Sequence, residues 1–173
     1  MERIRSKTAV VCDSGPIIHL DEVGCLSLLS DFLSVLVPHS VREEVLKHRQ
    51  IPFEDSNAPW VIVSPIFPLE ESMKSMCKMF SLAAGEVEAL SILNRERESI
   101  FLTDDSAARL VAAQLGYKVH GTIGVLIRAI RRGLMKPAEV IDVLNAFPLS
   151  STLHIKASLL EEVISRLKQE HGL

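Results

Sequence analysis

Short, mostly apolar runs separated by stretches of helical period are the feature that most restricts how this chain can fold. Five such runs recur, each of four or five residues: AVVC (9–12), LSVLV (33–37), WVIV (60–63), IFLT (100–103) and YKVH (117–120). Apolar character without alternation is typical of strands that are covered on both faces, as in parallel sheets. The runs therefore predict the strands of one parallel sheet.

The segments between these runs carry apolar residues at helical spacing and are punctuated by glycine and proline. The predicted helices begin near Pro16 and then cover 25–32, 40–48, 70–80, 86–97, 104–116, 121–133, 137–147 and 157–169. Strands that alternate with helices indicate an α/β fold with helices on both faces of the sheet. We expect a single-domain α/β/α sandwich over residues 1–150, with a helical extension, 151–173, packed on it.

Composition narrows the range of functions and of cellular locations. A net charge of −3 argues against a broadly basic nucleic-acid coat, and 5% aromatic residues are few for base-stacking platforms. Three cysteines without metal-site spacing indicate buried thiols in a reducing compartment. The N-terminal MERIRSK does not resemble a signal peptide, and no apolar run reaches the roughly 18 residues that span a bilayer. We expect a cytoplasmic protein without membrane attachment.

Carboxylates follow two of the predicted strands at the point where each strand ends. Asp13 comes directly after AVVC, and Asp104 and Asp105 come directly after IFLT. Because sites in parallel sheets lie at the carboxyl ends of the strands, these acids are candidates for one site. An aspartate in this place is also a common helix cap that complements the helix dipole. For each aspartate taken alone, a helix cap is therefore the alternative to a functional role.

Helical spacing adds two glutamates to this set. Glu86 borders the apolar stripe of its predicted helix, and Glu44 does the same on an earlier helix. Their neighbours Glu88 and Glu43 are expected to point to solvent. An acid at the rim of a buried face is unfavourable unless it is paired. A salt bridge or a helix cap is therefore the alternative to a catalytic role for either glutamate.

A cluster of carboxylates has a definite chemical preference. The acids repel one another, and some stay protonated near neutral pH unless a cation is present. Hard oxygen ligands suit Mg²⁺ or Mn²⁺, whereas the sequence lacks the His and Cys spacing of a zinc site. Such an ion activates water and stabilises an in-line displacement at phosphorus. The acids therefore favour metal-dependent cleavage of phosphoesters.

Five motifs occur in an order that resembles the PIN-domain ribonucleases, which include the VapC-type toxins of prokaryotic toxin–antitoxin pairs. They are DSGPIIHL, PHSVREEV, GEVEAL, TDDSAARLVAAQLG and HGTIGVL, within residues 9–147. The chain looks most like a branch with D-[AS]-G-P near the start, then GE, DD and GT-x-G-x-L. The resemblance implies an α/β/α fold and an acidic pocket that binds Mg²⁺ or Mn²⁺ and hydrolyses RNA.

Carried over to this sequence, the resemblance gives five acids a catalytic role. Asp13 matches the first family acid and Glu44 the second, Glu86 stands where many VapC-type proteins have aspartate, and Asp104 and Asp105 share the final acidic position. The implied metal ligands are Asp13, Glu86, Asp104 and Asp105, and which of the last two contacts the metal stays open. RNA is the implied substrate and an antitoxin protein the implied partner. Separately, the last predicted helix carries an apolar stripe that suits core packing or contact with a second copy of the chain: Leu159, Leu160, Val163, Ile164 and Leu167.

Two other functions compete with nuclease activity. A PIN-like fold can also serve as a non-catalytic module that binds protein or RNA, although the full set of acids argues against it. A phosphatase of the phospho-aspartate type expects Asp-x-Asp at the first strand, and here Gly15 stands two residues after Asp13.

Basic residues fit more than one role. Arg109 is expected to pair with Asp105 one helical turn earlier, with a phosphate contact as the alternative. Cations at a helix end are ordinary, yet they also suit RNA. Both interpretations apply to Arg128, Arg131, Arg132 and Lys136.

Overall fold

The computed structural model describes residues 8–51, 53, 58–64 and 67–173. The N-terminal MERIRSK lies outside the described residues. So do parts of 50–59, for which two prolines and polar residues predict a loop, and Pro65, which is predicted to bound the strand at 60–63. Every helix in the described part of the chain is too short or too polar to span a lipid bilayer. The three cysteines, Cys12, Cys25 and Cys77, are buried free thiols, as predicted.

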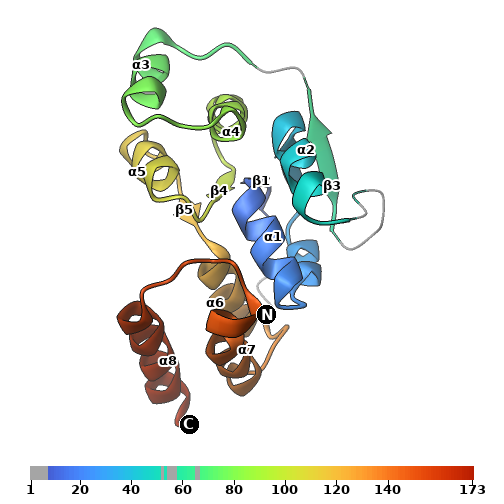
Figure 1. Ribbon diagram of the computed structural model, residues 1–173, viewed down its shortest axis with the longest axis vertical. Coiled ribbons are helices and arrows are strands. Elements are labelled where there is room, and N and C mark those ends of the chain that lie inside the picture. The colour runs from blue at the N-terminus through green and yellow to red at the C-terminus, as the bar shows by residue number, and fades with distance from the viewer. Residues whose placement is uncertain (1–7, 52, 54–57, 65–66) are drawn as a thin grey trace, which may run out of the picture.

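Within the described residues, five parallel strands form one sheet in the order β3-β2-β1-β4-β5 (Figure 1). The strands are β1 (Val10–Cys12), β2 (Val35–Pro38), β3 (Trp60–Val63), β4 (Ile100–Leu102) and β5 (Val119–His120). Strand β1 lies in the centre, where Val10 pairs with Val35 on one side and with Ile100 on the other. The predicted parallel sheet and α/β class are confirmed.

Helices cover both faces of this sheet. They are α1 (Ser14–Glu22), the 3-10 helix η1 (Leu26–Asp31), α2 (His39–His48), α3 (Glu71–Met79), α4 (Ala84–Arg95), α5 (Ser106–Gln114), α6 (Thr122–Arg132), α7 (Pro137–Ser150) and α8 (Ala157–His171). The predicted bounds differ from these by up to three residues at several helix ends. Helix α1 begins at Ser14, directly after the first acid, and α7 continues past Phe147, which is buried, to Ser150.

Two apolar cores explain why the strands are apolar along their whole length. Successive strand residues point to opposite faces of a sheet. Val10 and Cys12 therefore join one core, which includes residues of α1, α2, α6, α7 and α8. Val11 points the other way into a second core formed with α3, α4 and α5. Residues of β1 are fully buried in both directions, so a polar residue has no place before the strand ends.

The last helix packs on the first of these cores. Leu160 and Leu167 of α8 are buried there. Just before α8, the hydroxyls of Ser151 and Thr152 and the backbone N–H of Thr152 all donate to the carboxylate of Glu22, at 2.9, 2.8 and 2.7 Å respectively. Burial alone would raise the pKa of Glu22, but these donors lower it below its usual value. The chain is thereby fastened to the end of α1 before α8 begins.

Candidate active site

Asp13 is the residue at which the central strand gives way to α1. Its backbone N–H donates to the carbonyl of Leu102 at 2.9 Å, so the β1–β4 pairing continues to the acid. The side chain is 6% exposed, and its Oδ2 accepts the hydroxyl of Thr103 at 2.9 Å. Burial raises the pKa of Asp13 to about 6, against the lowering effect of the Ser14 N–H and Thr103. Asp13 thus carries a proton more readily than an ordinary aspartate.

Thr103 joins Asp13 to Asp105, and sequence reasoning missed it. Its fully buried hydroxyl donates to Asp13 and accepts the backbone N–H of Asp105 at 3.2 Å. Asp105 is the N-cap of α5, where its Oδ1 accepts the N–H of Ala108 at 2.8 Å. The capping interpretation of Asp105 is therefore correct, and one carboxylate oxygen stays available. A polar residue at the end of a buried strand was the signal for Thr103.

Glu86 faces the same place from the first turn of α4. Its Oε2 accepts the N–H of Ala83 at 2.7 Å, and the side chain is partly buried. Burial raises the pKa of Glu86 to about 7, and the neighbouring Asp105 and Asp13 carboxylates raise it further against the Ala83 bond. A hydrogen bond between the carboxyl groups of Glu86 and Asp105 favours the protonated form. Glu86 therefore holds a proton more readily than an ordinary glutamate.

Glu44 reaches the cluster from α2 because α2 and α4 lie very close together. The closest approach is at Gly85, where a Cβ would lie 2.8 Å from Cγ2 of Val41 and 3.9 Å from Oε2 of Glu44. A larger residue at position 85 would push the two helices apart. Glu44 is exposed, and its charge contributes to the raised pKa of Asp13. Four elements therefore bring Asp13, Glu44, Glu86 and Asp105 to one edge.

Asp104 follows the same strand as Asp105 but is held in a different way. Its Oδ1 accepts the backbone N–H of Thr122 at 2.8 Å. Its Oδ2 accepts the Thr122 hydroxyl at 2.5 Å and faces Nδ1 of His19 at 2.8 Å. Asp104 thus joins the start of α6 to α1. The N-cap of α6 is Gly121, and the hydroxyl of Thr122 donates to Asp104.

Glu88, which was expected to point to solvent, has a structural role, so that prediction is wrong. Its Oε2 accepts the hydroxyl of Ser40 at 2.6 Å and the backbone N–H of Ser40 at 3.2 Å. Ser40 lies in the first turn of α2, where backbone N–H groups lack partners within the helix. Helical spacing within α4 alone gave no sign that a second helix begins opposite this face.

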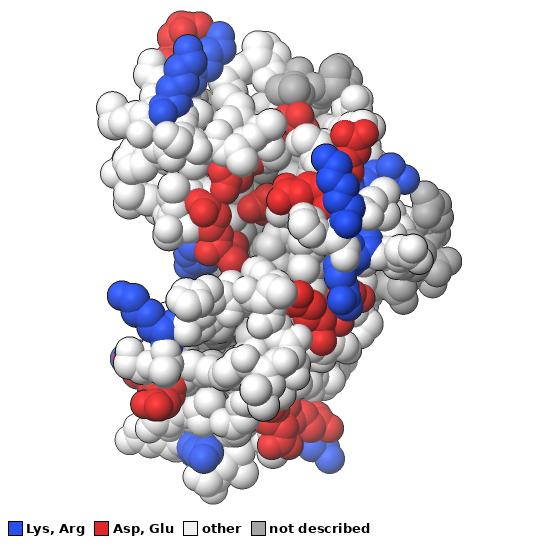
Figure 2. Space-filling model, viewed as in Figure 1, with Lys and Arg blue, Asp and Glu red and all other residues white. Residues whose placement is uncertain are grey.

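The acids form a negatively charged hollow on one face of the molecule. Figure 2 shows Asp and Glu side chains gathered in the hollow near the middle of this face. Several carboxylates at close range raise one another's pKa, as they do for Asp13 and Glu86. The hollow lies at the carboxyl ends of β1 and β4, where parallel sheets place their binding sites.

Comparison with known families identifies this arrangement. A family model described as a PIN domain matches residues 9–169, which is most of the chain. The chain belongs to the PIN-domain family. Its fold is therefore of the nuclease type. A search of curated proteins found no match.

The match also bears on the C-terminal part of this PIN domain. The resemblance in the sequence ended at residue 147, whereas the family model continues to residue 169 and includes most of α8. Helix α8 is thus part of what the family shares. The division of the chain at residue 150 stays a prediction.

The donor set of the PIN domain suits a hard divalent cation. Asp13, Glu44, Glu86 and Asp105 offer carboxylate oxygens alone, and their mutual repulsion is what such an ion removes. Across the residues that the structure describes, no three His, Cys, Asp or Glu side chains are arranged closely enough to hold an ion. The residues therefore fit Mg²⁺ or Mn²⁺ by their chemistry. The assignment of metal ligands, namely Asp13, Glu86 and one or both of Asp104 and Asp105, stays a prediction.

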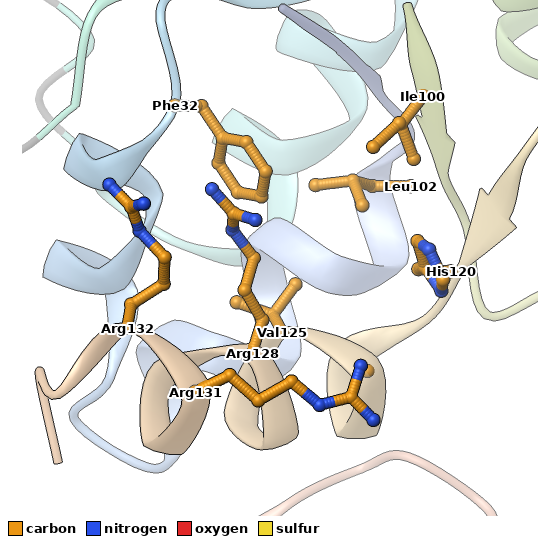
Figure 3. A pocket seen from close by; sticks show the side chains of 9 residues that line it. Phe32, Ile100, Leu102, His120, Val125, Arg128, Arg131 and Arg132 are labelled. Carbon is orange, nitrogen blue, oxygen red and sulfur yellow. The ribbon is translucent and has the colours of Figure 1, made fainter. Parts of the chain in front are cut away.

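Part of the predicted basic cluster serves packing. Arg128 and Arg132 both pair with Asp31, at 2.7 and 2.9 Å. The guanidinium of Arg128 also lies over the ring of Phe32, 4.8 Å from its centroid, in a cavity that His120 borders on the far side (Figure 3). These two arginines hold α6 to η1, which favours the structural interpretation over RNA contact for both.

Arg109 differs from its predicted pairing. The side-chain Nη1 of Arg109 donates to the carbonyl of Thr103 at 3.1 Å. The Asp105 carboxylate instead accepts the backbone N–H of Ala108, three residues further along the chain. The guanidinium is therefore held beside the acidic hollow. It has five N–H donors in all, so the bond to Thr103 uses only one of them.

Proposed function

We propose that this PIN domain is a metal-dependent ribonuclease that hydrolyses RNA phosphodiester bonds. The observation that supports this most directly is the convergence of Asp13, Glu44, Glu86 and Asp105, with pKa values of about 6 for Asp13 and about 7 for Glu86. Acids whose pKa values are raised toward neutral pH become good ligands once a divalent cation displaces the protons that they retain.

In the proposed mechanism, a bound Mg²⁺ or Mn²⁺ would activate water and stabilise the charge that develops on the phosphate. Asp13, Glu86 and Asp105 would hold the ion. Thr103 would hold the Asp13 carboxylate in place through its bond to Oδ2. Glu44, the exposed acid of the set, would accept a proton from the attacking water. Asp104, with three bonds to His19 and Thr122, positions the strand end rather than holding the ion.

The first test replaces Asp13. Asp13→Asn should abolish Mn²⁺-stimulated cleavage of a labelled single-stranded RNA while the protein stays folded. Asp142→Asn, an exposed residue on α7, makes the same chemical change far from the hollow and should cleave normally. If Asp13→Asn cleaves as fast as the parent, the assignment is wrong.

A non-catalytic interaction module is the alternative, and Mn²⁺ titration by calorimetry separates the two. If the protein is a nuclease, Mn²⁺ binding should release or absorb heat in the parent, and Asp13→Asn should abolish this heat. If the protein is an interaction module, the heat of Mn²⁺ titration should not depend on Asp13, and the parent should not cleave RNA.

The resemblance to VapC-type toxins supports a role in growth arrest, with an antitoxin protein as partner. Expression of the parent in a bacterial host should stop growth, and Asp13→Asn should relieve the arrest. Normal growth with the active parent would reject the toxin role and leave the nuclease in place. A homodimer is a further prediction, which the molar mass in solution would test.

A further inference from the structure

A cavity of about 580 Å³ lies beside the acidic hollow and belongs largely to the C-terminal part of the chain. It is bounded by the start of α6, by residues 153–156 and by the first two turns of α8, and Asp104 and Arg109 form the wall nearest the acids. The volume falls within the range of ligand-binding pockets. Because Asp104 directly follows β4 and adjoins Asp105, the cavity opens next to the proposed cleavage site.

The cavity combines an apolar wall with a cationic rim. Ile123, Leu159 and Val163 form much of the wall. Leu159 is 49% exposed, whereas Leu160 and Leu167 of the same helix are buried. The side chain of Leu159 is therefore accessible to a ligand in the cavity. The rim carries Arg109 on one side and Lys156, which is exposed, on the other.

The guanidinium of Arg109 is held between the hollow and the cavity. Its bond to the Thr103 carbonyl fixes it on the hollow side. Gly121 makes room for it, since a Cβ there would lie 3.1 Å from Nη1 of Arg109 and would collide with Oδ1 of Asp104. Burial lowers the pKa of the neighbouring His120, and Arg109, Arg131 and Arg128 lower it further. The positive field therefore extends along this wall.

We propose that this cavity binds one nucleotide of single-stranded RNA next to the bond that is cleaved. The apolar wall takes the base, and Arg109 and Lys156 take the flanking phosphates. Single-stranded RNA alternates flat bases with phosphates, which matches an apolar wall between cations. A polyanion also needs cations beside an acidic hollow, because the acids alone repel it. An acidic peptide would meet the same repulsion without a base to fill the wall.

This inference rests on the proposed function but can be tested without cleavage. Binding of a 5′-labelled ten-nucleotide RNA of mixed sequence is followed by fluorescence anisotropy in EDTA at pH 5.5, where the acidic hollow carries less charge. The variants are Lys156→Gln and Leu159→Asn. Their matched controls are Lys168→Gln, at the far end of α8, and Leu149→Asn, at a leucine that is 95% exposed outside the cavity.

The two cavity variants should differ in a characteristic way. Lys156→Gln should weaken binding about fivefold and reduce the slope of log K against log salt by about 0.7, as expected for one lost phosphate contact on a single strand. Leu159→Asn should weaken binding about fivefold with an unchanged slope, because it removes contact with a base. Both controls should bind like the parent, and thermal unfolding should show all four variants folded.

Unchanged binding by both cavity variants would overturn the proposal, as would equal losses in the controls. A parent protein that does not bind the RNA at low salt would also overturn it. These outcomes are distinct from failure of the proposed function, because Mn²⁺-dependent cleavage and its loss in Asp13→Asn are measured separately.

Discussion

Asp104 and Asp105 are neighbours in the chain, yet their carboxylates have opposite surroundings. Asp104 meets hydrogen-bond donors from His19 and Thr122, which stabilise its charge without any ion. Asp105 caps α5 with one oxygen, and its carboxyl group also contacts the carboxyl group of Glu86, whose pKa is raised. The comparison shows that the surroundings of a carboxylate depend on the donors that other elements bring to it, and not only on its place after a strand.

The largest effect is expected from Asp105→Asn. Asparagine caps helices as well as aspartate does, so the bond to Ala108 should survive and stability should change little. Loss of the ligand charge removes several kcal/mol of transition-state stabilisation, and cleavage should fall about a thousandfold. Single-turnover cleavage at saturating Mn²⁺ measures this, with urea unfolding as the check on stability. If Asp105→Asn cleaved RNA faster than Asp104→Asn does, the roles assigned to the two aspartates would have to be exchanged.

The next effect concerns pH. The pKa of Asp13 rises from 3.8 to about 6 on folding, which corresponds to about 3 kcal/mol. Below about pH 4 this carboxyl is protonated in both states, and as pH rises toward 6 the unfolded chain ionises first. The metal-free protein should therefore lose stability from pH 4 to pH 7.

Urea unfolding at several pH values measures this loss, and Asp13→Asn, which cannot ionise, should lose less stability than the parent over the same range. Mn²⁺ should restore stability to the parent above pH 7. Identical pH profiles for parent and Asp13→Asn would contradict the raised pKa of Asp13.

Asp104→Asn should show the opposite balance to Asp105→Asn. The amide that replaces one oxygen cannot accept the Thr122 hydroxyl or His19, so folding stability should fall by about 2 kcal/mol. Cleavage should fall about tenfold, since the residue positions the strand end and contacts no ion. His19→Ala should reproduce part of the stability loss. A fully stable Asp104→Asn without activity would show that Asp104 is a ligand instead.

The smallest effect is expected from Thr103→Val. It removes the hydroxyl that joins Asp13 to Asp105 and should lower stability by about 1 kcal/mol. Because this hydroxyl lowers the pKa of Asp13, its loss should shift the acidic limb of the cleavage profile to higher pH. Thr122→Val is the matched control, since it also removes a hydroxyl but serves Asp104. If the acidic limb shifted by the same amount in both variants, the hydroxyl at Asp104 would affect the pKa of Asp13 as much as the hydroxyl at Asp13 itself does, which would contradict this prediction.

Local patterns in the sequence were sufficient for the sheet and for the position of Asp13, because strand burial and a polar strand end are recorded in consecutive residues. The difference between Asp104 and Asp105 could not be predicted, since the donors to Asp104 come from His19 and Thr122, on other elements. Glu88 was misinterpreted for the same reason, because its partner Ser40 lies on another helix. Contacts between distant segments decide these cases, and spacing within one helix does not contain them.

The attachment of Ser151 and Thr152 to Glu22 has a consequence for engineering. The acids of the hollow all lie before residue 106, while residues 153–163 form much of the neighbouring cavity. Since the chain is fastened just before this segment, replacements within it should leave the position of the acids unchanged. A library confined to the cavity residues of this segment is therefore the natural starting point for selecting variants with altered preference for the nucleotide beside the cut.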